Sequence, residues 1–428
     1  MIKTVICLII IIIVVTKFNS YYRNIYDDVF EVSKKNMEQL MNANPIYVYI
    51  YVTCLFFLAS KCSLFEFSNG YYGSYIKNML LSVNSLKNEN NIPTPFIKEL
   101  SIVAIIIFSL ITSISGSGLG SEGVMIYLSV SLMIYIYFKF KKFINLDDVN
   151  TEILIYTGYA IGFDATFTSL ISTLIFIFEK MIINHSNILY SPSIVILLFI
   201  VVIVHISLKN RIPILNIKQL HFDYSNIINL LYIVIFSIII GVISFIFFTS
   251  FITLYNGVKK SKYKDFITVI FGILLAFMIH NFGLFISGSS ETVINEGFKN
   301  TDLNVDSFHT FNYKNVFGKI INCIISLGAG LSGGIVIPSI TIGSGLGSLY
   351  SNLLKSSYFT PIQHILPMTM PIENIMYIGI IAFLSPMLDA PLTSAVVINQ
   401  ISKQSFNTIP VSIIASFISY YTYKKLHQ

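Results

Sequence analysis

The sequence lacks tryptophan and has few charged residues. Asp, Glu, Lys and Arg make up 11% of its 428 residues, whereas 54% are hydrophobic. Soluble domains carry roughly 25% charged residues, so this chain has too little polar surface to cover a water-soluble globule. The composition therefore excludes a soluble domain and indicates a membrane protein. Its aromatic belt at the membrane surface has to consist of tyrosine and phenylalanine.

Cysteine is scarce and shows no functional pattern. Cys7, Cys54, Cys62 and Cys323 have neither paired spacing nor the spacing of metal ligands, so neither a disulfide framework nor a zinc site is expected. No motif indicates another cofactor. The 27 basic and 21 acidic residues leave a net charge of +6. In a membrane protein an excess of basic residues reflects the orientation of the loops, because positive charge is favoured on the cytoplasmic side. We therefore expect no nucleic-acid partner.

Apolar runs that suit membrane helices recur along the chain. They occupy residues 46–60, 101–115, 124–138, 152–184, 192–208, 227–256, 265–288, 316–328, 335–354, 373–399 and 407–423. The pattern predicts an all-α polytopic membrane protein embedded in the lipid bilayer, without a large soluble domain. An earlier run, Val5 to Val15, has the length of a signal peptide, but no small-residue cleavage site follows it. We therefore favour a retained first helix.

Two glycine-rich segments interrupt apolar runs at corresponding places. Ser115-Gly-Ser-Gly-Leu-Gly-Ser-Glu-Gly123 lies between two short runs, and Gly328-Ala-Gly-Leu-Ser-Gly-Gly334 repeats the arrangement. Such paired interruptions point to a transporter site built from broken helices. The run from Val124 to Phe138 makes a helix of about 22 Å, shorter than a hydrocarbon layer of ~30 Å. We expect this helix to begin inside the membrane.

An internal repeat supports two pseudo-symmetric halves. Phe163-Asp-Ala-Thr-Phe-Thr-Ser169 and Leu388-Asp-Ala-Pro-Leu-Thr-Ser394 share one pattern, displaced by 225 positions (389 − 164). Chance similarity between two apolar segments is the alternative. The predicted organisation is an N-terminal helix and polar segment over 1–45, a first half over 46–215 and a second half over 216–428.

Glu122 is the clearest candidate for chemistry. It begins a short apolar run. Placing a carboxylate within the bilayer costs free energy, so its presence there indicates a function. The N-terminus of a helix attracts an anion, so Glu122 and a mobile anion would compete for the same N–H groups. Protonation of Glu122 would then open the site. The alternative is a glutamate that merely caps its helix.

The neighbouring glycines have two interpretations. Gly116, Gly118 and Gly120 permit positive φ and a close approach of backbone amides to a ligand, or they serve close helix packing. The second glycine-rich segment offers the amides of Ile335 and Val336. Two helix starts facing one point would form an uncharged anion cage.

These motifs resemble the CLC family of chloride channels and chloride/proton exchangers. Gly120-Ser-Glu-Gly-Val124 is similar to its G-R-E-G-P signature, and Ser332-Gly-Gly-Ile-Val-Ile-Pro-Ser339 to G-x-F-x-P. Phe163 to Met181 resembles the helix that ends F-I-I-E-E-M, and Ala390-Pro-Leu-Thr393 also has a counterpart. Each motif alone is weak, but all four occur in the family's order over residues 46–423.

The resemblance implies a set of site residues. Glu122 would be the external gate, with a role in proton transfer. The anion-binding amides would belong to Gly120, Gly123, Val124, Ile335 and Val336. The serine of the family's G-S-G-I-P loop is best matched by Ser74, with Ser68 as the fallback. We do not place the family's central tyrosine, because its last helix has no convincing match.

Departures from the family bear on mechanism. The internal proton-transfer glutamate of the exchangers aligns with Lys180, which follows Glu179, and a cation does not relay protons in the same way. The signature Arg, Pro and Phe are replaced by Ser121, Val124 and Val336, but backbone donors survive these changes. The resemblance implies a homodimer that passes chloride or a similar small anion, as a channel or with weak proton coupling. A coupled chloride/proton antiporter is the alternative.

Other ionisable residues leave rival hypotheses. We expect Asp164 and Asp389 to cap helices, and His205 and His280 to be satisfied buried histidines rather than proton relays. A membrane-embedded enzyme would use Glu122, Asp164 or His280 as acid or base, but it needs several polar groups that converge at one depth. No such cluster is apparent in the sequence, so we expect no enzyme. A non-conducting family member is a further possibility.

Overall fold

The computed structural model describes residues 2–61, 99–144, 149–208, 215–288, 294–295, 297–298, 311–356, 361 and 367–428. Within these ranges the regular elements are helices, and the only extended pairing is an isolated antiparallel bridge between Gly120 and Gly334. The predicted all-α architecture is confirmed.

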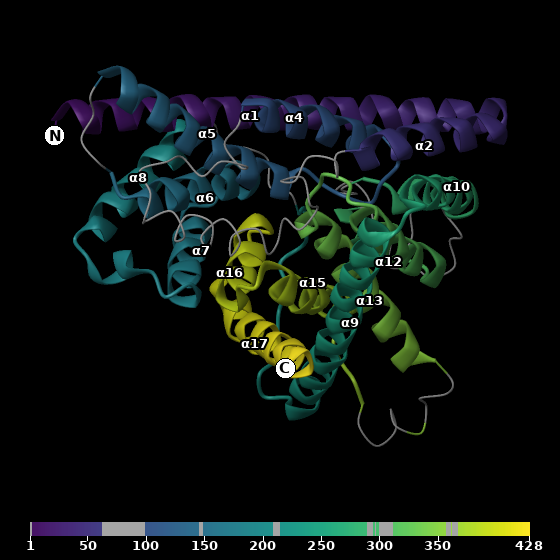
Figure 1. The fold of residues 1–428 in the computed structure, drawn as a ribbon. Coiled ribbons are helices and arrows are strands. Elements are labelled where there is room, and N and C mark those ends of the chain that lie inside the picture. The colour runs from purple at the N-terminus through teal and green to yellow at the C-terminus, as the bar shows by residue number, and fades with distance from the viewer. Residues whose placement is uncertain are drawn as a thin grey trace.

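The helices form two successive series along the chain (Figure 1). The first comprises α1 (Ile2–Ala43), α2 (Pro45–Ser60), α4 (Glu99–Ile114), α5 (Glu122–Ile144), α6 (Thr151–Phe167), α7 (Leu170–Ile183) and α8 (Ser193–Ser207). The second comprises α9 (Ile227–Lys260), α10 (Lys264–Phe282), α12 (Tyr313–Gly328), α13 (Val336–Lys355), α15 (Ile372–Leu388), α16 (Pro391–Ile401) and α17 (Ile409–His427). The 3-10 turns are η3 (Asn187–Tyr190), η4 (Leu284–Ile286) and η6 (Phe406–Thr408).

Equivalent helices make equivalent contacts in the two series. The long helix α1 packs on α4, α6 and α8, and the long helix α9 packs on α12, α15 and α17. The closest partners are α5 with α6 in one series and α13 with α15 in the other. Across the series, α2 packs against α10, and α7 against α16. The order of the helices thus assigns α1 to the first series, while the predicted division at residues 45 and 215 remains a prediction.

Glycines allow the closest helix pairs to touch backbone to backbone. A Cβ on Gly158 would lie 2.5 Å from the Cα of Val130, and one on Gly162 would lie 2.4 Å from the Cα of Ile126. In the second series, a Cβ on Gly343 would lie 2.4 Å from the carbonyl oxygen of Gly379. Small residues four positions apart are the usual device for close packing of membrane helices.

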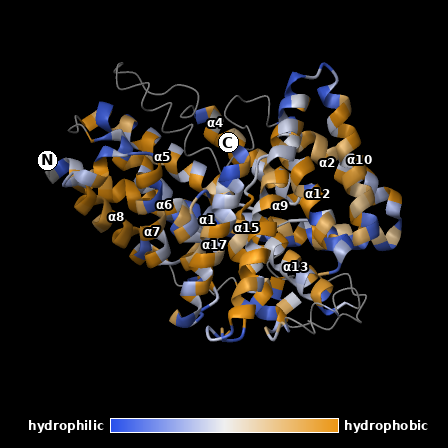
Figure 2. Cartoon of the chain, turned by 90° about the horizontal axis from the view of Figure 1, so that it is seen from below, coloured by the Kyte–Doolittle hydropathy of each residue, from blue (hydrophilic) through white to orange (hydrophobic). Residues whose placement is uncertain are grey.

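Four helices in the described ranges are long and apolar enough to cross a membrane. They are α1, α5, α9 and α10, and shorter apolar helices such as α8 accompany them. Hydrophobic residues cover most of α8 (Figure 2), where Phe199 and Ile206 are 69% and 76% exposed. Apolar side chains on an outer surface match the lipid environment that the composition predicts.

The N-terminal helix is longer than a single span. The predicted first membrane helix and the polar segment after it form one helix, α1, of 42 residues. Because the rise is 1.5 Å per residue, it extends for about 63 Å. No glycine or proline interrupts it, and it ends where Asn44 caps α2 and Pro45 takes the first position of that helix.

The lengths of three predicted runs were wrong. α5 has 23 residues and continues past Phe138 to Ile144, because lysine is a good helix former and its charge is favourable at a helix C-terminus. The run 152–184 is split into α6 and α7 at Thr168, and the run 373–399 into α15 and α16 at Asp389. Both break residues have left-handed backbones, with φ of 49° and 51°.

The repeat motif gave the wrong register. Thr168 and Asp389 occupy equivalent breaks 221 positions apart (389 − 168), whereas the shared motif predicted 225. Asp164 therefore lies inside α6, one helical turn before the break, while Asp389 lies at the break itself. The two-series fold is present, but these two aspartates are not structural equivalents.

Candidate functional site

The two glycine-rich segments fold into equivalent loops. Gly116 follows α4 by two residues and Gly330 follows α12 by two residues, and both have φ of 78°. The next helices begin six residues later, at Glu122 and Val336. All of these equivalent positions are 214 apart (336 − 122). Positive φ is available to glycine at little cost, which explains why each loop needs glycine at its first bend.

The loops are joined directly by their backbones. The N–H of Gly120 donates to the carbonyl of Gly334 at 2.8 Å, and the N–H of Gly334 donates to the carbonyl of Gly120 at 2.6 Å. An antiparallel pair that exchanges both bonds is symmetric about a local two-fold axis. Since the two glycines are equivalent positions, the axis relates the loops. The structure thus brings together the two helix starts that the sequence analysis singled out.

Glu122 lies at this junction. Glu122 is the first residue of α5 and is 1% exposed. A Cβ on Gly120 would lie 2.5 Å from Oε2 of Glu122, and a Cβ on Gly334 would lie 2.7 Å from the same oxygen. The carboxylate therefore occupies the space that the missing side chains of both glycines leave. That explains glycine at both positions.

The other residues predicted to bind the anion surround the junction between Gly120 and Gly334. Gly123 and Val124 complete the first turn of α5, and the amide nitrogen of Gly123 lies 2.6 Å from a Cβ position on Gly334. Ile335 and Val336 start α13 and are each 7% exposed. The first N–H groups of a helix have no partner within it, so both helix starts direct backbone donors toward the junction. Ser74 and Ser68 lie outside the described residues.

Sequence analysis missed a side chain that holds the first loop in place. Asn322 of α12 accepts a hydrogen bond from the N–H of Gly118 at 2.9 Å and donates to the carbonyls of Gly116 and Ile286 at 3.1 and 2.7 Å. The thiol of Cys323 donates to the carbonyl of Gly118 at 3.2 Å. Asn322 is a polar residue inside an apolar run, and such residues face the protein interior. This position was the signal that could have identified it.

The sequence analysis also missed Lys319, which is a buried lysine. Lys319 lies one turn before Asn322 and is 0% exposed. Its ammonium group donates to the carbonyl of Ser287 at 3.4 Å and to that of Gly288. The charges of Lys319 and Glu122 lie close enough to interact. A positive charge near the junction favours both the ionised glutamate and a passing anion.

Helix α1 supports the junction from the other side. Asn19 donates to the carbonyl of Met125 at 3.2 Å, in the first turn of α5. The guanidinium of Arg23 donates to the carbonyl of Ala165 at 3.0 Å and to that of Thr166, at the C-terminal end of α6. A cation at that end of a helix complements its dipole. A buried arginine therefore stabilises the end of α6 where the helix breaks.

The predicted internal proton-site residues lie at another helix junction. The ammonium group of Lys180 donates to the carbonyls of Leu388 and Asp389 at 2.7 and 3.1 Å, at the end of α15. The carboxylate of Glu179 accepts from the N–H groups of Leu392 and Thr393 at 2.9 and 2.8 Å. It also accepts from the hydroxyl of Thr393 at 2.6 Å. Each side chain thus neutralises the helix end that it contacts.

Of the two aspartates expected to cap helices, Asp389 does so, as the C-cap residue of α15, whereas Asp164 lies inside α6. Asp164 lies in the last turn of α6 and contacts His205 and Thr173, while Asp389 follows α15 and pairs with Lys424 at 2.8 Å. Neither precedes a first helical turn by the one position that an N-cap requires.

The side chain of His205 is 32% exposed. His280 is exposed on α10 and contacts the ring of Tyr49, so neither histidine is buried as predicted.

Broken helices whose starts meet inside an all-α bundle are typical of polytopic membrane transport proteins. The family model for the voltage gated chloride channel matches residues 66–424. The chain therefore belongs to this family, as the motifs suggested, and it is an integral multi-pass membrane protein. No curated protein sequence matches it.

Solved structures share the fold. A slow cyanobacterial Cl−/H+ antiporter has a TM-score of 0.76 and 15% identity, over 99% of this chain and 95% of its own. A CLC-type fluoride/proton antiporter has a TM-score of 0.69 and 17% identity, over 98% and 96%. A eukaryotic CLC transporter has a TM-score of 0.70 and 13% identity, over 100% and 73%.

Proposed function

We propose that the protein passes chloride or a similar small anion across a membrane, through a pathway gated by Glu122. The observation that supports this most directly is the double hydrogen bond between Gly120 and Gly334. It places the starts of α5 and α13 at one buried point. Backbone amides at helix starts bind anions without introducing a charge of their own, so the anion stays mobile.

The gate works by competition. The ionised carboxylate of Glu122 lies against Gly120 and Gly334, where the first-turn amides of α5 and α13 attract negative charge. A proton on Glu122 removes most of this attraction, and an anion then takes the place of the carboxylate. Anion passage accordingly rises as pH falls.

Proton coupling is weak or absent in this proposal. At the position of the exchangers' internal glutamate, Lys180 is engaged with two carbonyls. The neighbouring Glu179 accepts three hydrogen bonds from α16. Moving a proton through either group requires breaking these contacts. A coupled antiporter is the second candidate, since two of the similar structures are described as antiporters.

Anion flux from liposomes tests the gate. Purified protein is reconstituted with chloride, nitrate or fluoride inside, and flux is measured at pH 5.5 and 7.5. Glu122→Gln imitates the protonated gate, so its flux at pH 7.5 should lie well above that of the wild type at the same pH and should depend less on pH. Glu152→Gln is the matched control, because Glu152 also begins an apolar helix and is 6% exposed. A Glu122→Gln variant with the pH dependence of the wild type contradicts the gate.

The reversal potential separates the two candidates. In vesicles with a pH gradient but equal chloride, a channel gives no shift, whereas a coupled antiporter gives a shift that follows the proton gradient. The expected result is no shift or a small one. A full shift at the stoichiometry of an exchanger would replace the channel with the antiporter.

The rival assignments make different predictions. A non-conducting family member gives no flux with any of the three anions. An enzyme requires catalytic groups that converge, but the contacts of Glu122, Asp164 and His280 lie on different elements. No group of three metal-binding side chains occurs in the residues the structure covers.

We also propose a homodimer, which the mass of the purified protein in detergent would test.

A further inference from the structure

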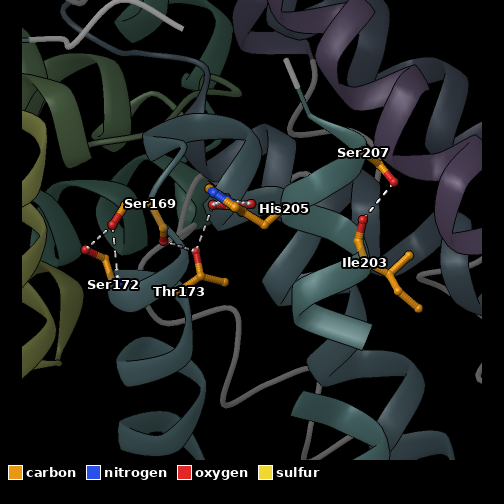
Figure 3. A network of polar contacts seen from close by, with 7 residues as sticks. Ser169, Ser172, Thr173, Ile203, His205 and Ser207 are labelled. Atoms are coloured by element: carbon orange, nitrogen blue, oxygen red, sulfur yellow. Dashed lines mark hydrogen bonds and ion pairs between the residues drawn. The ribbon is translucent and has the colours of Figure 1, made fainter. Parts of the chain in front are cut away.

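Asp164 of α6 and His205 of α8 form an acid–base pair. The two carboxylate oxygens of Asp164 lie 3.2 and 3.0 Å from Nδ1 of His205. The hydroxyl of Thr173 donates to the carboxylate at 3.2 Å. Figure 3 shows the side chains of Thr173 and His205 approaching from α7 and α8. Three helices therefore contribute to this contact.

The two partners differ in access to the exterior. The side chain of Asp164 is 0% exposed, whereas that of His205 is 32% exposed. A buried charge is stable only when it is paired and hydrogen-bonded. The imidazole is therefore partly open near the C-terminal end of α8, while the carboxylate stays enclosed. Protonation of His205 then completes an ion pair, and loss of that proton leaves a single buried negative charge.

Asp164 lies on α6, the helix that packs against α5, which carries the gate. Thr166 follows Asp164 by two residues, and its hydroxyl contacts the sulfur of Met125 at 3.8 Å. Met125 lies in the first turn of α5, three residues after Glu122. The last turn of α6 thus packs against the start of α5. In a medium of low dielectric constant, a change of one charge at this place is felt at the helix start.

Other charged groups face the pair from α1. The ammonium group of Lys17 donates to the carbonyl of Ser207 at 2.6 Å, at the end of α8. Arg23 contacts the end of α6 and pairs with Asp27 at 3.6 Å. The first turn of α7 contributes the uncharged hydroxyl group of Thr173. Lys17 and Arg23 thus bring two basic side chains from α1 to the ends of α8 and α6.

We propose that Asp164 and His205 form a second proton-binding site, separate from Glu122, and that its protonation increases anion passage. The proton adds one positive charge at the last turn of α6, which packs against the first turn of α5. The effect on flux rests on the proposed function. The binding of the proton does not.

The flux experiment uses the Glu122→Gln background, in which the main gate no longer titrates. Flux is measured between pH 5.5 and 8. We expect a remaining rise of roughly threefold to tenfold on acidification. Glu122→Gln with His205→Gln should stay at the low value, and Glu122→Gln with His205→Lys at the high value. Asp164→Asn in the same background should move the midpoint to lower pH by about one unit, because the imidazolium loses its counter-charge.

His280→Gln in the Glu122→Gln background is the matched control, because it removes an exposed histidine from α10. It should keep the remaining pH dependence. A flat profile for Glu122→Gln alone overturns the second site. A rise that survives His205→Gln shows that the proton binds elsewhere and also overturns the proposal.

Thermal unfolding in detergent separates this proposal from the proposed function. The ion pair exists only in the folded state, so the melting temperature of the wild type should rise relative to His205→Gln when the pH falls from 8 to 5.5. If no variant passes anions, the proposed function fails while this difference still reports the proton. If the two proteins show the same pH dependence of melting, no proton binds at the pair.

Discussion

Gly120 and Gly334 exchange a pair of backbone hydrogen bonds, at 2.8 and 2.6 Å. They are equivalent positions of two loops, and the carboxylate of Glu122 lies against both. One contact therefore joins the two series of helices and forms the proposed anion site. Substitutions at the two glycines should nevertheless have different effects.

Gly120→Ala should weaken the gate while the protein still folds. The three heavy atoms nearest to the new Cβ would be the carboxylate oxygens and carbon of Glu122, at 2.5 to 2.9 Å, and that flexible side chain can move away. The displaced carboxylate leaves the amides open to anions. We expect a severalfold higher flux at pH 7.5 and a smaller effect of acidification. Unchanged flux would show that the carboxylate does not obstruct the pathway.

Gly334→Ala should instead reduce stability. Its Cβ would lie 2.6 Å from the backbone nitrogen of Gly123 and 3.1 Å from that of Glu122, and a helix backbone cannot yield as a side chain does. Overpacking of this kind costs about 1–3 kcal/mol. The yield of folded protein and its melting temperature in detergent should fall below those of Gly120→Ala. Equal stability of the two variants would contradict the geometry of the junction.

Asn322→Leu should loosen the loop that precedes Glu122. The leucine fills a similar volume, but the N–H of Gly118 and the carbonyls of Gly116 and Ile286 lose their partner. Buried polar groups left unpaired cost about 1–3 kcal/mol each. We expect a lower melting temperature together with a weaker response of flux to pH. Asn322→Asp keeps the acceptor for Gly118 and should lie between leucine and wild type.

Lys180→Met should destabilise the protein without altering proton coupling. It leaves the carbonyls of Leu388 and Asp389 without their donor, at a cost of about 1–3 kcal/mol. Lys424→Met is the control, because it removes a partly exposed ion pair with Asp389 that contributes about 0–1 kcal/mol. The reversal potential under a pH gradient should not change in either variant. A shift that disappears with Lys180→Met would make this lysine part of a proton route.

Gly162→Val should separate α5 from α6. A Cβ at Gly162 would lie 2.4 Å from the Cα of Ile126, whereas a Cβ at Gly257 would meet nothing within 4 Å. Gly257→Ala on α9 is therefore the control and should gain about 0.5–1 kcal/mol of helix stability. Gly162→Val should lower the melting temperature sharply or prevent folding. Similar behaviour of the two variants would argue against close packing of α5 on α6.

The sequence predicted the features that depend on local pattern. Hydrophobic runs gave the all-α membrane fold, and four weak motifs in the right order gave the family. The two glycine-rich interruptions correctly marked helix starts that meet. Backbone positions such as Gly116 and Gly330, with φ of 78°, are predictable because few residues other than glycine adopt them. The roles of Glu122 and the surrounding amides remain predictions.

The sequence did not predict features that depend on long-range contacts. Asn322 and Gly118 are 204 positions apart, and no local pattern pairs an asparagine with a particular loop. The end of α5 and the breaks at Thr168 and Asp389 were also missed, since hydrophobicity does not report backbone conformation. A shared motif misaligned Asp164 with Asp389 by one turn, because similar residues recur on a helix at that spacing.

The pairing of Gly120 with Gly334 also has a consequence for biosynthesis. The chain is made from its N-terminus, so α5 enters the membrane with its acidic residue before the partner loop has been synthesised. A further 214 positions (334 − 120) must be translated before the two loops can join. Until then the early half has a glutamate that only the late half can enclose. The proposed anion site is therefore among the last parts of the molecule to form, and a ribosome that stops early leaves an incomplete protein without this site.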